Sequence, residues 1–155
     1  MAIYWMKGDY SMQNINLVGT WKLISTIGQS PNENPIYPYG ENPFGRLMYD
    51  NNGNVSVFIM RRGRSKFVSS DYAGGTAEEI KEAFEGLSAY CGTYEIDEDK
   101  GIVTHHIEGD RFPNWEGTDQ LRFFKLSGNQ LTLNTPPVLT WGKEWIFSLI
   151  WKLKT

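Results

Sequence analysis

Hydrophobic and polar residues alternate along most of this chain, with the two-residue period of β-strands that bury one face. The clearest run is residues 144–154, in which an aromatic or aliphatic side chain occupies every odd position. Turn-forming residues separate the runs, and we predict eight strands: 20–27, 45–50, 54–62, 89–96, 102–108, 118–127, 130–135 and 144–154. They predict an all-β fold, an eight-stranded antiparallel β-barrel, because closure removes edges that an aromatic-rich sheet would leave exposed.

One segment between the strands has a helical period and is predicted as a short inserted α-helix. Thr76 and Glu79 form a capping box at its start, in which each side chain bonds an otherwise unpaired backbone N–H group. The apolar positions of this segment fall on one helical stripe: Ala77, Ile80, Phe84 and Leu87. A single helix among strands is expected to pack on the barrel as a plug or a lid.

The turn at residues 128–129 predicts which face of its two strands points inward. A two-residue loop with glycine first pairs Leu126 with Leu131 and sets Arg122 opposite Thr135. The face that carries these leucines must be the inward one, and Arg122 shares its parity. A one-residue slip would move every side chain to the opposite face.

Matching this face to the two preceding strands predicts a row of polar residues inside the barrel. His105 is expected opposite Arg122, with Tyr94 on the other side of His105 and Thr135 beyond Arg122. If the long loop before residue 118 shifts this register by one residue, His106 replaces His105 on the inward face.

A buried polar row is costly unless its groups are satisfied, so it indicates either a ligand or an internal network. A neutral His105, with a reference pKa of about 6.5, could act as a general acid or base. Arg122 could hold a carboxylate or enolate oxygen, and Tyr94 could donate a hydrogen bond to it. Mutual satisfaction of the three side chains remains the alternative.

The remaining inward positions are mostly aromatic, so any cavity is expected to be narrow and suited to a flat or slender apolar molecule. An eight-stranded barrel is just wide enough to fill itself with side chains or to hold one small ligand. The residues expected to contact a ligand are Tyr94, His105, Arg122, Tyr49, Tyr90, Phe124, Thr135, Phe147 and Trp151.

Composition and charge narrow the function classes. The formal net charge of -3 argues against binding nucleic acid, which requires clustered Lys and Arg. No apolar run approaches the roughly 18 residues that span a bilayer, and no Cys, His and acidic cluster has metal-ligand spacing. The single Cys91 requires no oxidising compartment, so a cytoplasmic protein is expected, with no metal and no cofactor.

The chain is expected to form one barrel domain over residues 15–155, preceded by a disordered or extended segment over residues 1–14. The many aromatic residues, 14% of the chain, leave room for an apolar interface, so a homodimer stays open.

Several stretches together resemble the bacterial and fungal lipocalin-like domain family, from about residue 17 to the C-terminus. They are residues 45–49 (GRLMY), 90–94 (YCGTY), 103–108 (VTHHIE), 112–122 (FPNWEGTDQLR) and 131–133 (LTL). The resemblance implies a calycin-like β-barrel with an internal small-molecule cavity. Some similar small barrels in natural-product pathways act as cyclases or isomerases.

Three functional hypotheses follow. The first is a barrel that binds a small hydrophobic molecule bearing one polar or anionic group, oriented by Arg122, His105 and Tyr94. The second is a cofactor-independent cyclase or isomerase acting on a hydrophobic metabolite, with His105 transferring a proton, Arg122 stabilising charge and Tyr94 assisting. The third, a structural or interaction domain, becomes preferable if the barrel is packed solid.

Overall fold

The computed structural model describes residues 14–155, so the prediction made for residues 1–14 falls almost entirely outside the described residues. The elements in chain order are β1 (Gly19–Gln29), β2 (Phe44–Tyr49), β3 (Asn54–Met60), α1 (Ala77–Glu85), β4 (Leu87–Asp97), β5 (Ile102–Asp110), the 3₁₀ helix η1 (Pro113–Trp115), β6 (Asp119–Ser127), β7 (Gln130–Asn134), β8 (Val138–Thr140) and β9 (Lys143–Leu153).

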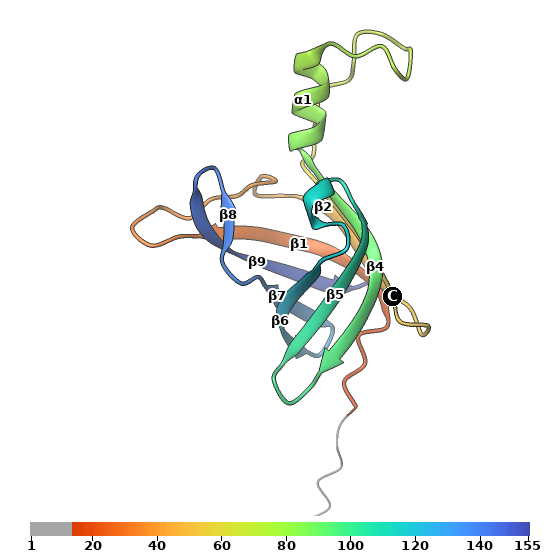
Figure 1. Ribbon diagram of the computed structural model, residues 1–155, viewed down its shortest axis with the longest axis vertical. Helices are drawn as coiled ribbons and strands as arrows, with labels where there is room; N and C mark the ends of the chain where they lie inside the picture. The colour runs from red at the N-terminus through yellow and green to blue at the C-terminus, as the bar shows by residue number, and fades with distance from the viewer. Residues whose placement is uncertain (1–13) are drawn as a thin grey trace, which may run out of the picture.

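The strands close into a barrel (Figure 1). Antiparallel neighbours run in the order β1-β2-β3-β4-β5-β6-β7-β9, and β9 pairs back with β1. The predicted eight-stranded antiparallel barrel with one short helix is therefore confirmed. The additional strand β8 pairs only with β9, as one arm of a hairpin outside the ring. Its turn contains Trp141 at φ 50° and Gly142 at φ 76°.

The two ends of the barrel have connections of different length. At the tight-turn end the strands are joined by residues 50–53, 98–101 and 128–129. At the long-loop end they are joined by residues 30–43, 61–86, 111–118 and 135–142, which include α1, η1 and β8 (Figure 1). Every long insertion therefore emerges from the same end.

The apolar core lies toward the tight-turn end. Trp21, Trp151, Leu17, Leu47 and Leu131 are almost completely buried. Leu17 precedes the first strand and accepts a hydrogen bond at its carbonyl oxygen from the indole Nε1 of Trp21, at 2.9 Å. The chain before β1 thus seals this end with a buried side chain and a satisfied polar group.

Helix α1 begins as predicted, but it is not a plug. Thr76 and Glu79 form the capping box, with Glu79 N donating to Thr76 Oγ1 at 3.2 Å and Thr76 N to Glu79 Oε2 at 2.8 Å. No residue of the helix is buried, and it projects away from the barrel above β4 (Figure 1). Only Gly86 separates α1 from β4, so the helix continues outward from the strand instead of folding over the barrel.

Candidate functional site

His105 lies at the centre of the barrel, because β5 places Val103, His105 and Ile107 on its buried face. The imidazole is completely buried and is held between two phenol groups. Its Nε2 lies 2.7 Å from the hydroxyl of Tyr49, and its Nδ1 lies 2.8 Å from the hydroxyl of Tyr90. His105 rather than His106 is thus the inward histidine, as the register predicted.

The imidazole of His105 is neutral at physiological pH. Burial, with smaller contributions from the charges of Arg122 and His106, lowers its pKa to about 3. Burial also raises the pKa of Tyr49 and of Tyr90, so both remain protonated. A neutral imidazole has one N–H donor and one acceptor, so one tyrosine donates to His105 and the other accepts from it.

Hydrogen-bond satisfaction assigns the tautomer of His105. The hydroxyl of Tyr49 is buried and, among the described residues, hydrogen-bonds only with His105, so it must donate to Nε2. Nδ1–H then donates to the hydroxyl oxygen of Tyr90. The hydroxyl hydrogen of Tyr90 is consequently free to donate to another group.

Tyr94 is paired with His105 across β4 and β5, as predicted, but it does not take part in this network. Its hydroxyl donates to the carbonyl oxygen of Asp50 at 2.9 Å, toward the tight-turn end. Its ring packs edge-on against the ring of Tyr49, with centroids 4.6 Å apart. The hydroxyl hydrogen of Tyr94 is therefore used by Asp50, and Tyr49 and Tyr90, not Tyr94, hydrogen-bond to His105.

Arg122 is inward and buried, although its predicted register was wrong by two residues. Val103 pairs with Arg122 and His105 with Gln120, and the connection between β5 and β6 contains η1. A shift of two residues keeps the same side chains inward. Arg122 Nη1 donates to the carbonyl oxygen of Leu121 at 2.8 Å.

The guanidinium of Arg122 has no acidic partner within ion-pair distance among residues 14–155. It lies 6.0 Å from the ring centroid of Trp115. It is also close enough to Tyr90 to lower the pKa of that phenol against the larger, opposite effect of burial. The barrel therefore contains the buried cation of Arg122 beside Tyr90, whose hydroxyl hydrogen is available as a donor.

A β-bulge adds Asp110 to this group. Cys91 pairs with Gly109 and Gly92 with Ile107, so Glu108 is the extra residue of β5. Beyond the bulge Asp110 faces Tyr90, on the inward side. Strict alternation from His105 would turn Asp110 outward, so its inward position does not follow from the two-residue period.

The carboxylate of Asp110 is only half satisfied. Oδ1 accepts a hydrogen bond from the backbone N of Phe112 at 2.6 Å, but Oδ2 is buried and has no partner among the described residues. Burial raises the pKa of Asp110, while the charges of Arg111 and Arg122 act in the opposite direction. The glycines that flank the bulge, Gly92 and Gly109, were the available signal in the sequence.

The other predicted contact residues lie on the barrel wall. Trp151 is buried in the core, against which Phe124 and Phe147 pack. The hydroxyl of Thr135 accepts from the backbone N of Phe147 at 2.9 Å, which ties β9 to the end of β7 and uses that group within the barrel. Of the predicted set, Tyr49, Tyr90 and His105 are joined directly, and Arg122 adjoins Tyr90.

Two hollows, of about 530 and 440 Å³, open on the outer surface around β2 and β3. The larger is lined by outward side chains of β2, β3 and β4, such as Met48, Phe58 and Cys91, and reaches Tyr90 and Asp110. Neither is lined by His105 or Arg122. An internal cavity beside His105 stays a prediction.

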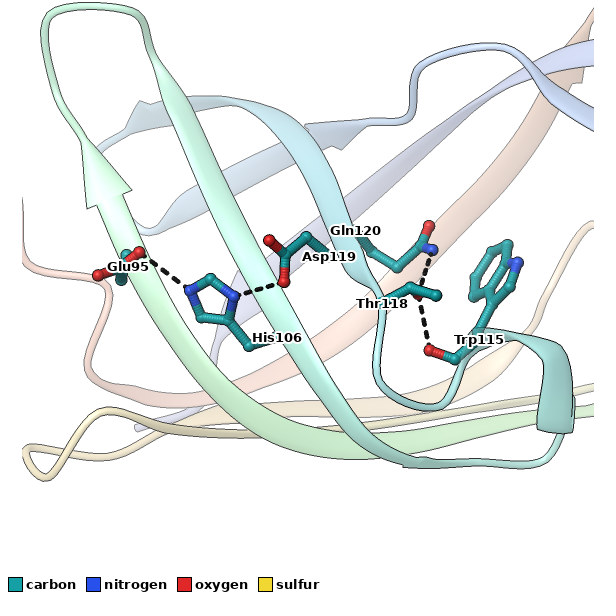
Figure 2. A network of polar contacts seen from close by, with 6 residues as sticks. All are labelled: Glu95, His106, Trp115, Thr118, Asp119 and Gln120. Atoms are coloured by element: carbon teal, nitrogen blue, oxygen red, sulfur yellow. Dashed lines mark hydrogen bonds and ion pairs between the residues drawn. The ribbon is translucent and has the colours of Figure 1, made fainter.

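His106 forms a separate network on the outer wall (Figure 2). Its Nδ1 lies 2.6 Å from Asp119 Oδ1 and its Nε2 lies 2.9 Å from Glu95 Oε2, and these contacts raise its pKa. The carboxylates lie on opposite sides of the ring and link β4, β5 and β6. Among residues 14–155 no three His, Cys, Asp or Glu side chains are grouped to hold a metal.

Comparison with protein families identifies the barrel. A model of the lipocalin-like domain matches residues 18–153. The chain belongs to the lipocalin-like domain family. This confirms the resemblance seen in the sequence. No helix in the described part of this lipocalin-like chain has the length and apolar character to traverse a bilayer.

One curated relative of this lipocalin-like protein is 30% identical over 105 residues, which cover 63% of this chain and 95% of the relative. It is the 4'-hydroxy-3'-methoxypropiophenone carrier protein of Aspergillus oryzae. Among solved structures, an uncharacterized protein from Bacteroides eggerthii covers 90% of this chain and 100% of its own, with 11% identity and a TM-score of 0.45.

Proposed function

We propose that this protein binds and carries a small, largely apolar molecule that bears a polar or anionic oxygen. The observation that carries the proposal is the buried guanidinium of Arg122, which has no acidic partner among the described residues. A buried cation that no carboxylate contacts is costly, and an oxygen of a ligand would offset that cost.

The ligand oxygen would receive two hydrogen bonds. Tyr90 has its hydroxyl hydrogen free, because His105 Nδ1–H occupies the oxygen of that phenol. Arg122 supplies charged donors beside it. Since Tyr49 and His105 fill the barrel below Tyr90, the ligand head would sit on the long-loop side of His105. Its apolar part would extend toward the exposed hydrophobic side chains of that end.

The contacts of His105 favour ligand binding over catalysis by proton transfer. Both nitrogens of His105 are engaged by tyrosines, and its pKa of about 3 makes it a weak base. The cyclase or isomerase alternative needs a free lone pair on this imidazole, and no contact of His105 favours it. The name of the curated relative also supports carriage of an aromatic ketone.

The test uses 4'-hydroxy-3'-methoxypropiophenone and unsubstituted propiophenone as probes, with affinity measured by calorimetry and by quenching of tryptophan fluorescence. Arg122→Met removes the buried cation with little change in length. We expect it to weaken binding by about tenfold or more, since a hydrogen bond to a charged group contributes about 1.5–3 kcal/mol.

Arg46→Met is the matched control, because Arg46 lies on the outer wall over the ring of Phe44. Its affinity for both probes should equal that of the wild type. Absence of saturable binding of either probe, or equal binding by Arg122→Met and wild type, would overturn the proposal.

A further inference from the structure

We propose that Asp110 selects ligands that carry a hydroxyl group, accepting a hydrogen bond from it at Oδ2. This inference rests on the proposed function and names its ligand class: small apolar molecules whose polar head has both an oxygen acceptor and a phenolic or alcoholic O–H. Tyr90 and Arg122 would contact the acceptor, and Asp110 the donor.

The first support is the unsatisfied oxygen itself. A buried carboxylate oxygen without a donor is expensive, and Oδ2 of Asp110 is such an atom. The other oxygen is committed to the backbone N of Phe112, which fixes the orientation of the carboxylate. The neighbouring Arg111 does not form an ion pair with it, because Arg111 Nη1 donates to the carbonyl oxygen of Phe84 at the end of α1.

The second support is the β-bulge that aims Asp110 inward. Bulges bend a strand locally and often re-aim one side chain at a functional site. At this bulge the backbones of β4 and β5 approach so closely that only glycine fits, because a Cβ on Gly92 would lie 1.9 Å from the carbonyl oxygen of His106. Because of the bulge, Asp110 faces Tyr90 instead of solvent.

The third support is the arrangement of charges. Asp110 is paired with Tyr90 across β4 and β5, and Arg122 acts electrostatically on both, so the three groups lie near one another toward the long-loop end. They do not form an ion pair within 4.0 Å. A head with an acceptor and a donor would match an arginine and an aspartate held apart in this way, whereas a purely anionic head would be repelled by the aspartate.

The experiment compares 4'-hydroxypropiophenone with 4'-methoxypropiophenone, in which a methyl group replaces the hydroxyl hydrogen that would form the hydrogen bond to Asp110. The wild type should bind the hydroxy probe at least about tenfold more tightly, the discrimination expected when a buried acceptor loses its donor. Asp110→Asn keeps an oxygen that can accept from Phe112 N but replaces the free carboxylate oxygen with an NH2 group, which is a donor. We expect this variant to lose or reverse the preference.

Glu116→Gln is the control for charge alone. Glu116 is exposed, raises the pKa of Asp110 electrostatically and accepts from the backbone N of Asp110 at 3.4 Å. The preference for the hydroxy probe should persist in this variant. If the wild type binds both probes equally while Arg122→Met still loses affinity, the role of Asp110 is wrong and the proposed function stands. If neither probe binds the wild type, the proposed function itself fails.

Discussion

The two ends of this barrel differ in how completely they are packed and satisfied. At the tight-turn end, Asp50 accepts three hydrogen bonds at its carboxylate and Trp21 donates to Leu17. The connecting turns at that end contain no hydrophobic residue. The long loops at the other end expose large hydrophobic side chains: Tyr37, Val68, Tyr72, Ile80, Phe84, Phe112, Leu139 and Trp141.

Most of the buried polar atoms that have no partner among the described residues also lie toward the long-loop end: Thr26 Oγ1, Asp110 Oδ2, Arg111 Nε and Trp145 Nε1, whereas Trp151 Nε1 lies in the core near the tight turns. Unsatisfied polar atoms and unpacked apolar side chains both cost stability, and binding sites are where proteins commonly accept that cost. The difference supports the proposal that the barrel is stabilised from one end and binds its ligand at the other.

The largest effect on stability is expected when one tryptophan at each end is replaced and the two variants are compared. Trp21→Ala should lower the free energy of unfolding by about 3–5 kcal/mol, because a fully buried indole leaves a cavity. Trp141→Ala, in a side chain that is 70% exposed, should change it by about 0.5 kcal/mol or less. Urea denaturation followed by far-UV circular dichroism measures both. Similar losses in the two variants would contradict the proposed division between the ends.

The next effect concerns the buried imidazole of His105. Its pKa is about 3 in the folded protein and near 6.5 when unfolded, so acid favours the unfolded state. The associated stability is complete above pH 6.5 and is lost as the pH falls from 6.5 toward 3. The slope approaches about 1.4 kcal/mol per pH unit.

In His105→Gln, the free energy of unfolding should fall less steeply with decreasing pH when urea denaturation is repeated at several pH values. His106→Gln is the control, because the carboxylates of Asp119 and Glu95 raise the pKa of His106. The stabilisation from His106 is present below pH 6.5 and is lost as the pH rises through its folded pKa. An acid loss that His106→Gln reduces and His105→Gln leaves unchanged would reverse these assignments.

A smaller effect is expected at the bulge that turns Asp110 inward. Gly92→Ala should destabilise the protein by about 1–3 kcal/mol, since its Cβ would collide with the carbonyl oxygen of His106. Gly109→Ala is the matched control, because the nearest atom to its Cβ would be Cys91 Sγ at 4.0 Å. Thermal unfolding compares the two, and equal melting temperatures would mean that the bulge adapts freely.

The smallest effects are expected when one hydroxyl group is removed from each end. Tyr94→Phe deletes the bond to Asp50 O and should lower global stability by about 0.5–1.5 kcal/mol. Thr76→Val deletes the side-chain cap of α1, which should weaken the helix locally by about 1 kcal/mol. Because α1 buries no residue, the urea midpoint should not move. Amide hydrogen exchange would report faster exchange in α1 alone; a shifted midpoint would show that the helix supports the barrel.

Much of the barrel could be predicted from the sequence because its signals are local. Alternation with period two depends only on each strand having one apolar face, and it located the barrel strands and placed His105 and Arg122 inward. The capping box of Thr76 and Glu79 depends on residues three apart, and it marked the start of α1.

Features that join distant segments could not be predicted in this way. The register between β5 and β6 depends on the conformation of the whole connection between them, and the direction of the Tyr94 hydroxyl depends on where the turn at Asp50 lies. Likewise, whether α1 covers the barrel depends on the direction in which Gly86 leads into β4, which the apolar stripe of the helix does not encode.

The sequence by itself therefore determined the strands, the closed barrel and the inward face that carries His105 and Arg122, since side-chain polarity alone sets which face is buried. Only the tertiary structure decided what surrounds them: Tyr49 and Tyr90 on the imidazole, and Asp110 turned inward by the bulge opposite Gly92. The physical reason is that a bulge breaks the two-residue period, and its position is set by backbone pairing between strands.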